Sequence, residues 1–170
     1  MHDLPLPTPI DQREVVAVTA RVTTLKGPGA GAYYVEALPS YYLDNDEPRG
    51  RWHGHGAAQL GLTGDVDDDV FLRVMAGHSP TGTAVHLGRP YVDDSVRGFD
   101  VTASAPKSVS TLFALGDAAG RAEVLAAHDT AVAAMVSWIE THAHTRYRIN
   151  GDVAVVDAEG IVAAEFRQHT

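Results

Sequence analysis

The sequence predicts an α+β protein in which helices pack on an antiparallel sheet. Strand-like segments lie near the start of the chain, around residue 100 and near its end, and the longest helical pattern precedes the last group. Asn150-Gly151 separates two segments rich in β-branched residues, which is a strong signal for an antiparallel hairpin. The order strand, helices, strand, helix, long helix, strands is typical of helices layered on an antiparallel sheet.

The first half of the chain alternates short elements with loops. Residues 15–24 are rich in β-branched side chains, and this composition predicts a strand. A Gly/Pro cluster at 27–31 then precedes a short helix that carries Tyr33 and Tyr34. The remaining elements expected in this half are a loop at 43–56 anchored by Trp52, one helical turn at 57–60, and a capped helix at 65–77 with Asp in its first turn.

The second half contains the longest predicted helix. Asp117 is a suitable N-cap for a helix over 118–142. Apolar side chains recur there at steps of seven, four and three residues, which places them on one helix face, at Leu125, Val132, Val136 and Ile139. The other elements predicted here are a strand at 99–104, a helix at 106–114, hairpin strands at 146–149 and 153–157, and a third strand at 161–167.

Composition indicates one globular domain. The chain has 170 residues, of which 45% are hydrophobic, and this is enough to build a core. It has no cysteine, which excludes disulfides and thiolate zinc sites. It also has no apolar run long enough to predict a transmembrane helix and no signal-peptide pattern, so we expect a cytoplasmic protein. Residues 1–14 are predicted to be a loose tail, and residues 15–170 the domain.

The charge balance argues against nucleic acid as a partner. Acidic residues number 22 and basic residues 13, which gives a net charge of −9, whereas nucleic-acid-binding surfaces are usually basic. The acidic residues are clustered in predicted turns and helix starts, however, so they need not lie on a binding face. Basic residues of the second half are candidates for a shared surface: Arg97, Lys107, Arg146, Arg148 and Arg167.

The segment at 98–110, GFDVTASAPKSVS, places a carboxylate in an apolar strand that leads into a helix. Burying Asp100 is costly unless its carboxylate is partnered. Pro106 suits the first turn of a helix, and Lys107 and Ser108 then lie at a helix N-terminus, where an anion such as phosphate is favoured. The alternative interpretation is a capped helix after a strand with one solvent-facing Asp.

Two tyrosine pairs lie eight residues apart. Tyr33 and Tyr41 begin the pairs, and Tyr34 and Tyr42 complete them. A tyrosine can act as a covalent nucleophile, but its ordinary pKa near 10 requires a nearby base or cation at neutral pH. Alternatively, the pairs are amphipathic packing residues.

The segment at 98–110 resembles the signature of the TrwC/TraI-type (MobF) conjugative relaxases. Further blocks match this family in order, namely the tyrosine pairs, the glycine-rich block at 50–64 (GRWHGHGAAQLGLTG), the helix segment at 127–132 and the approach to the metal site at 163–170. The resemblance implies an HUH-relaxase-like fold, and we expect this chain to be its N-terminal portion, truncated before the C-terminal part.

The resemblance also implies residue roles. Tyr33 would attack the scissile phosphate and leave a 5′-phosphotyrosyl link, and Tyr41 would serve a later strand transfer. Tyr34 and Tyr42 would be secondary tyrosines. Asp100 would orient a metal-ligating histidine or help to take the tyrosine proton. Lys107 and Ser108 lie in the family signature, and we predict that they contact a DNA phosphate.

The family binds a divalent metal through three histidines. Of these the resemblance assigns only His169, one residue beyond the usual position, where this sequence has Gln168. The family's H-x-H pair, expected about ten residues further on, has no counterpart in the 170 residues. The pairs His53/His55 and His142/His144 are poor substitutes, since the first lies in a glycine-flanked loop and the second at a helix end.

These observations predict a fragment of a conjugative relaxase that nicks single-stranded DNA at a transfer origin by tyrosine transesterification. We expect the fragment to be inactive alone and not to hold the metal stably. The expected partners are single-stranded DNA and other conjugation proteins. The alternative is a vestigial or regulatory module that binds single-stranded DNA without catalysis.

Overall fold

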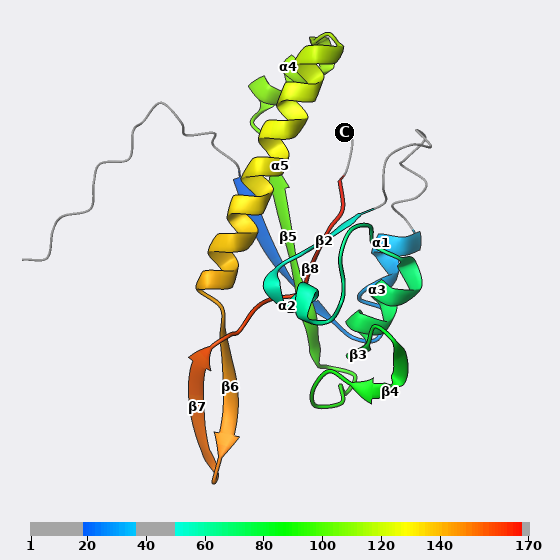
Figure 1. Ribbon diagram of the computed structural model, residues 1–170, viewed down its shortest axis with the longest axis vertical. Coiled ribbons are helices and arrows are strands. Elements are labelled where there is room, and N and C mark those ends of the chain that lie inside the picture. Colours follow the sequence, from blue (N-terminus) through cyan, green and yellow to red (C-terminus); the bar gives the residue numbers. More distant parts are fainter. Residues whose placement is uncertain (1–18, 37–49, 168–170) are drawn as a thin grey trace, which may run out of the picture.

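The computed structural model describes residues 19–36 and 50–167 (Figure 1). The elements follow the predicted order of strand, helices, strand, helix, long helix and strands, with three further short strands between residues 51 and 86. They are β1 (Thr19–Lys26), α1 (Ala32–Glu36), β2 (Arg51–His53), α2 (His55–Gln59), α3 (Asp68–Met75), β3 (His78–Ser79), β4 (Gly82–His86), β5 (Val96–Ser104), α4 (Lys107–Leu115), α5 (Ala118–Thr141), β6 (His144–Ile149), β7 (Asp152–Asp157) and β8 (Ala163–Glu165).

The strands of the described region pair as four antiparallel two-stranded ladders rather than as one continuous sheet. The longest ladder joins β1 to β5, from Thr19 opposite Ser104 to Lys26 opposite Val96. The others are β2–β8, β3–β4 and β6–β7. Helices and antiparallel strands therefore form the fold, as the sequence predicts.

Helix α5 lies across one face of the β1–β5 ladder (Figure 1). Ala20 and Ala103 are opposite each other in this ladder, and both face the helix across a pocket that Val132 and Met135 also line. Side chains alternate between the two faces of a strand. Asp100, three residues before Ala103, therefore points to the opposite face. The ladder separates an α5 side from an Asp100 side.

The glycine-rich block at 50–64 packs closely against the segment around β8. Residues 51–53, expected to lie in a loop, instead form β2 and pair with β8, with Arg51 opposite Glu165 and His53 opposite Ala163. A Cβ at Gly56 would lie 2.8 Å from the carbonyl oxygen of Ile161, and one at Gly54 would lie 2.3 Å from the same oxygen. Glycine is therefore required for this close backbone approach.

The core is small and centred on an aromatic cluster. The ring of Phe71 lies 5.1 Å from that of Phe166, 6.0 Å from that of Tyr34 and 6.3 Å from that of Trp52. Trp52 therefore anchors its segment on the core, as predicted. The buried hydrophobic residues of the described region are Ala57, Leu62, Val66, Phe71 and Val132.

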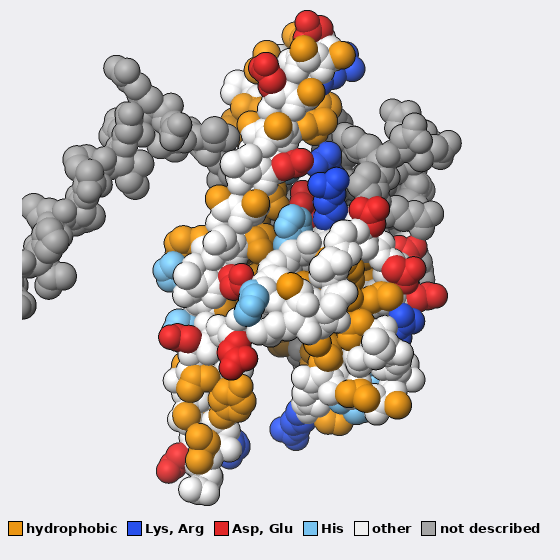
Figure 2. Space-filling view, viewed as in Figure 1, with side chains coloured by type: hydrophobic (Ala, Val, Ile, Leu, Met, Phe, Trp, Pro, Cys, Tyr) orange, Lys and Arg blue, Asp and Glu red, His pale blue; other side chains and the backbone are white. Residues whose placement is uncertain are grey.

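Two local predictions are confirmed closely. The Asp117 carboxylate accepts a hydrogen bond from the Gly120 amide at 2.9 Å and caps α5. Asn150 and Gly151 both have positive φ, 53° and 97°, and connect β6 to β7. This hairpin projects beyond the end of α5, and hydrophobic side chains gather on it (Figures 1 and 2).

Two other boundaries differ from the prediction. The helix expected at 65–77 begins later, because the Asp67 side chain caps α3 and the backbone of Asp65 forms an isolated antiparallel β-bridge with that of Arg51. The expected strand at 161–167 is limited to β8, and residues 15–18 of the first strand lie outside the described residues. None of the helices that the structure describes is long and apolar enough to cross a membrane.

Candidate functional site

The first tyrosine pair lies on α1, and its two members have different surroundings. Tyr33 is 58% exposed. Tyr34 is half-buried, with its ring stacked on Phe166 at 5.6 Å and set edge-on to Phe71 at 6.0 Å. The rings of Tyr33 and Tyr34 are themselves in edge contact at 5.5 Å. One phenol of the pair is therefore available to solvent while its neighbour belongs to the aromatic cluster.

Asp100 is the hydrogen-bond partner of Tyr34. The Tyr34 hydroxyl donates to the Asp100 carboxylate, which joins α1 to the middle of β5. Burial, and then the negative charge of Asp100 and this hydrogen bond, raise the pKa of Tyr34 well above its ordinary value of 10.0. Tyr34 therefore stays protonated at neutral pH, and Asp100 has the partner that a carboxylate on an apolar strand needs.

Lys107 and Ser108 lie where the sequence predicts, in the first turn of α4. Both are exposed. The residue before them, Pro106, provides no side-chain cap, so the capped-helix interpretation lacks its capping hydrogen bond. Two exposed side chains at an uncapped helix N-terminus can approach an anion.

Three predicted site residues, Tyr41, Tyr42 and His169, lie outside the described residues. The two H-x-H pairs are described, and neither gathers a metal site. His53 donates to Glu165 at 2.7 Å, while His142 donates to a carbonyl of its own helix and His144 pairs with Asp157 at 3.3 Å.

Within 19–36 and 50–167, a single group of side chains has the geometry of a metal site. His128, Asp129 and Glu165 each offer a ligand atom, and these atoms lie within 4.8 Å of one another. Sequence reasoning missed this group because no local spacing signals it: two members are neighbours on α5 and the third lies on β8. Only their placement in the fold brings them together.

The sequence matches the family model described as TrwC relaxase over residues 28–170. It is 38% identical over 141 residues to the multifunctional conjugation protein TraI of Escherichia coli, and the match covers 83% of this chain and 8% of TraI. TraI of Escherichia coli strain K12 matches with the same identity and coverage.

Solved structures of the conjugative relaxase TrwC have the same fold. A copper-bound complex with oriT DNA matches with a TM-score of 0.69 and 34% identity, over 89% of this chain and 52% of that chain. A metal-free complex with oriT DNA matches with a TM-score of 0.67 and 32% identity. A third TrwC structure matches with a TM-score of 0.66 and 31% identity, and it contains a 27-mer DNA comprising the recognition hairpin and the cleavage site.

These matches define a relaxase-like fold, and the chain belongs to the TrwC relaxase family. It spans about half of the TrwC chains and a small part of TraI. The one metal ligand that the resemblance assigns, His169, lies outside the described residues, and the single metal-capable group among the described residues contains one histidine and two carboxylates. No catalytic step is therefore assigned to a metal at this site.

Proposed function

We propose that this chain is the tyrosine-bearing part of a conjugative relaxase domain that nicks single-stranded DNA at a transfer origin. One observation carries the proposal: an exposed Tyr33 on α1 lies beside Tyr34, whose hydroxyl is bound to the signature carboxylate Asp100. The family membership of the chain supplies the reaction class, and the DNA in the TrwC structures supplies the class of partner.

The proposed reaction is a transesterification. The Tyr33 phenolate oxygen attacks the scissile phosphorus, a bond forms between them, and the bond to the departing sugar oxygen breaks and leaves a 3′-hydroxyl after protonation. The 5′-phosphate stays on Tyr33. Tyr34 is unsuited to this role because its raised pKa keeps the proton on its oxygen.

The remaining predicted residues complete the proposal. Lys107 and Ser108, exposed at the start of α4, would contact a phosphate of the bound strand. Tyr41 would attack in a later strand transfer, with Tyr42 as its secondary neighbour. A divalent metal belongs to the proposal as the family's cofactor, with His169 as the one assigned ligand, and other conjugation proteins are proposed as partners.

A chimaera provides the test. The 170 residues are fused to the C-terminal half of the TrwC relaxase domain and incubated with a single-stranded oligonucleotide that contains a transfer origin. A covalent protein–DNA adduct on a denaturing gel is expected. Tyr33→Phe should abolish it, and Tyr34→Phe should retain it. Adduct that survives Tyr33→Phe contradicts the assignment of the nucleophile.

The second candidate function is binding of single-stranded DNA without catalysis. The DNA bound in the TrwC structures supports it, because DNA binding requires neither a nucleophile nor a metal. The two functions differ in one result: a binding module retains the oligonucleotide on a native gel, yet its chimaera forms no adduct with any divalent metal.

A further inference from the structure

One imidazole and two carboxylates lie close together in the fold, from His128, Asp129 and Glu165. Their ligand atoms lie within 4.8 Å of one another. Two ligand atoms bound to one ion at about 2.1 Å and at a tetrahedral angle lie about 3.4 Å apart, so closing the site requires each pair of side chains to approach by at most about 1.4 Å. The three side chains are half-buried rather than fully exposed, which distinguishes them from the acidic groups scattered over the surface.

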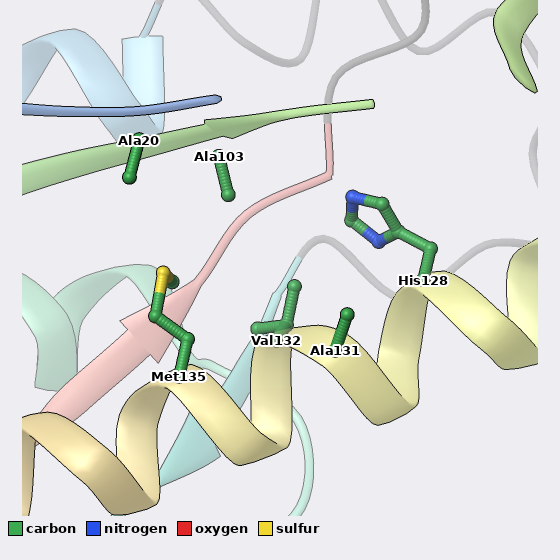
Figure 3. Close-up of a pocket in the computed structure, with 6 residues that line it drawn as sticks. All are labelled: Ala20, Ala103, His128, Ala131, Val132 and Met135. Atoms are coloured by element: carbon green, nitrogen blue, oxygen red, sulfur yellow. The ribbon is translucent and has the colours of Figure 1, made fainter. Parts of the chain in front are cut away.

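His128 has a buried ring nitrogen that no described residue satisfies. Its Nδ1 is buried and has no hydrogen-bond partner among the described residues. Figure 3 shows the imidazole projecting from α5 into the space below β5, where the other labelled side chains are all apolar. A buried nitrogen without a partner is costly. Coordination of an ion through this nitrogen would remove the cost.

The two carboxylates are held in place by neighbours. His53 Nε2 donates to Glu165 Oε2 at 2.7 Å, and Arg167 Nη2 donates to Asp129 Oδ1 at 2.5 Å. Each of these contacts uses one oxygen of its carboxylate. A histidine or arginine that fixes a ligand carboxylate from outside is the usual outer shell of a metal site. Without an ion, the same two partners balance the negative charge.

We propose that His128, Asp129 and Glu165 bind a divalent transition-metal ion that links α5 to β8. One imidazole with two carboxylates suits Mn²⁺, Co²⁺ or Zn²⁺ better than Mg²⁺ or Ca²⁺, which prefer all-oxygen sets. This site shares no residue with the three-histidine set that the family resemblance implies. It also does not depend on the nicking reaction, because none of its ligands is assigned a role there.

Zn²⁺ and Co²⁺ are the probes for the test. The tag-free, chelator-treated 170-residue chain is titrated with Zn²⁺ by calorimetry and with Co²⁺ by visible absorption. One site with d–d bands is expected. Glu165→Gln and His128→Gln should each lower the affinity about tenfold or more, since even outer-shell changes cost about 10- to 100-fold. At the same concentration, Zn²⁺ should raise the thermal midpoint of the wild type more than that of Glu165→Gln.

His144→Ala is the matched control, because His144 forms an exposed His–carboxylate pair with Asp157 that has no third ligand among the described residues. Its affinity should equal that of the wild type. Circular dichroism of each variant verifies its fold. Four results would each overturn the proposal. They are no saturable binding of Zn²⁺ or Co²⁺, equal affinity in Glu165→Gln and the wild type, loss of the site in His144→Ala, and tighter binding of Mg²⁺ than of Zn²⁺.

Discussion

Two adjacent phenols on α1 differ because of what surrounds each oxygen. Tyr33 faces solvent, whereas Tyr34 is covered by Phe166 and hydrogen-bonded to Asp100. Burial and a nearby carboxylate both disfavour the tyrosinate form. The pair therefore separates into one phenol open to a substrate and one that stays protonated and structural.

The raised pKa of Tyr34 predicts an alkaline loss of stability. Its pKa in the folded state exceeds the unfolded value of 10.0, so its contribution is complete below about pH 10 and is lost as pH rises toward the folded pKa. Urea unfolding at pH 8 and pH 11 measures this loss. Tyr34→Phe should cost about 1 kcal/mol at pH 8, the net value of one hydrogen bond, and should lose less stability than the wild type between the two pH values.

The exposed phenol on the hairpin, Tyr147, is the control for this measurement. Tyr147→Phe should match the wild type at pH 8 because it breaks no contact with Asp100. A Tyr34→Phe variant that loses as much stability as the wild type between pH 8 and pH 11 would contradict the assignment.

At the residue scale, the sequence identified candidate site residues, but it did not predict which of them contact one another in the fold. Asp100 needed a partner because a carboxylate on an apolar strand is costly, but the partner, Tyr34, is distant in sequence. The pairing of His128 and Asp129 with Glu165 has no signal in spacing either. Such contacts depend on tertiary packing rather than on local pattern.

At the element scale, the glycine-rich block and the segment around β8 act as one unit. The Ala57 amide donates to the Ile161 carbonyl at 3.2 Å, and β2 pairs with β8 alongside. This unit was only partly predictable. Trp52 was expected to anchor on the core, but a three-residue strand between glycines has too short a pattern to identify. Asp117 and Asn150-Gly151 were predictable because caps and tight turns are local.

Gly56→Ala tests the close approach of α2 to residues 160–161. The added Cβ would lie 2.8 Å from the Ile161 oxygen and 2.9 Å from its carbonyl carbon, both of them backbone atoms. We expect a loss of about 2 kcal/mol in the free energy of unfolding, despite the better helix propensity of alanine. Denaturant unfolding measures it. Gly29→Ala, with nothing within 4 Å of its Cβ, should change stability by less than about 0.5 kcal/mol. Equal effects at the two positions would refute this packing role.

Glu140 joins the end of α5 to the same unit. Its Oε1 accepts from the His55 amide at 2.7 Å and the Ile161 amide at 2.8 Å. The hydrogen bond from Ile161 is the main cause that lowers the pKa of Glu140 below its ordinary value of 4.5. Its contribution to stability is therefore present above about pH 4.5 and is lost as pH falls through the folded pKa.

Glu140→Gln should accordingly be less stable than the wild type at pH 7, and the difference should shrink as pH falls below about 4.5, where protonation begins to remove the same charge. Thermal unfolding from pH 7 to pH 3 measures this. Glu123→Gln, on an exposed turn of the same helix, is the control and should differ little from the wild type. A gap between Glu140→Gln and wild type that stays constant with pH would rule out the charge as its cause.

At the scale of the whole molecule, much apolar surface is exposed. On the β6–β7 hairpin alone, the exposed apolar side chains include Tyr147 (56%), Ile149 (61%) and Val155 (59%), and Trp138 on α5 is 63% exposed. Element order and fold class were predictable from periodicity and turn signals. The division into four ladders was not, because no local pattern determines which strands become neighbours.

The 170-residue chain by itself should form no covalent adduct with single-stranded DNA at any divalent metal concentration. Its only H-x-H pairs are engaged elsewhere, at His53 and at His142 and His144. Phosphoryl transfer without a cation at the scissile phosphate loses charge stabilisation and orientation. Denaturing gels with transfer-origin oligonucleotides provide the measurement, and the chimaera described above is the positive control. A Tyr33-dependent adduct from the chain alone would show that its own residues complete the site.

The pairing of β2 with β8 also sets an order of events during synthesis. His53 and its partner Glu165 are separated by 112 residues. At about 5–20 residues per second, a ribosome needs on the order of 10 seconds to make that interval. The glycine-rich block therefore leaves the ribosome before β8, its pairing partner, has been synthesised. Closing so long a loop is slow, so we expect the native state of this unit to form only after translation has passed β8.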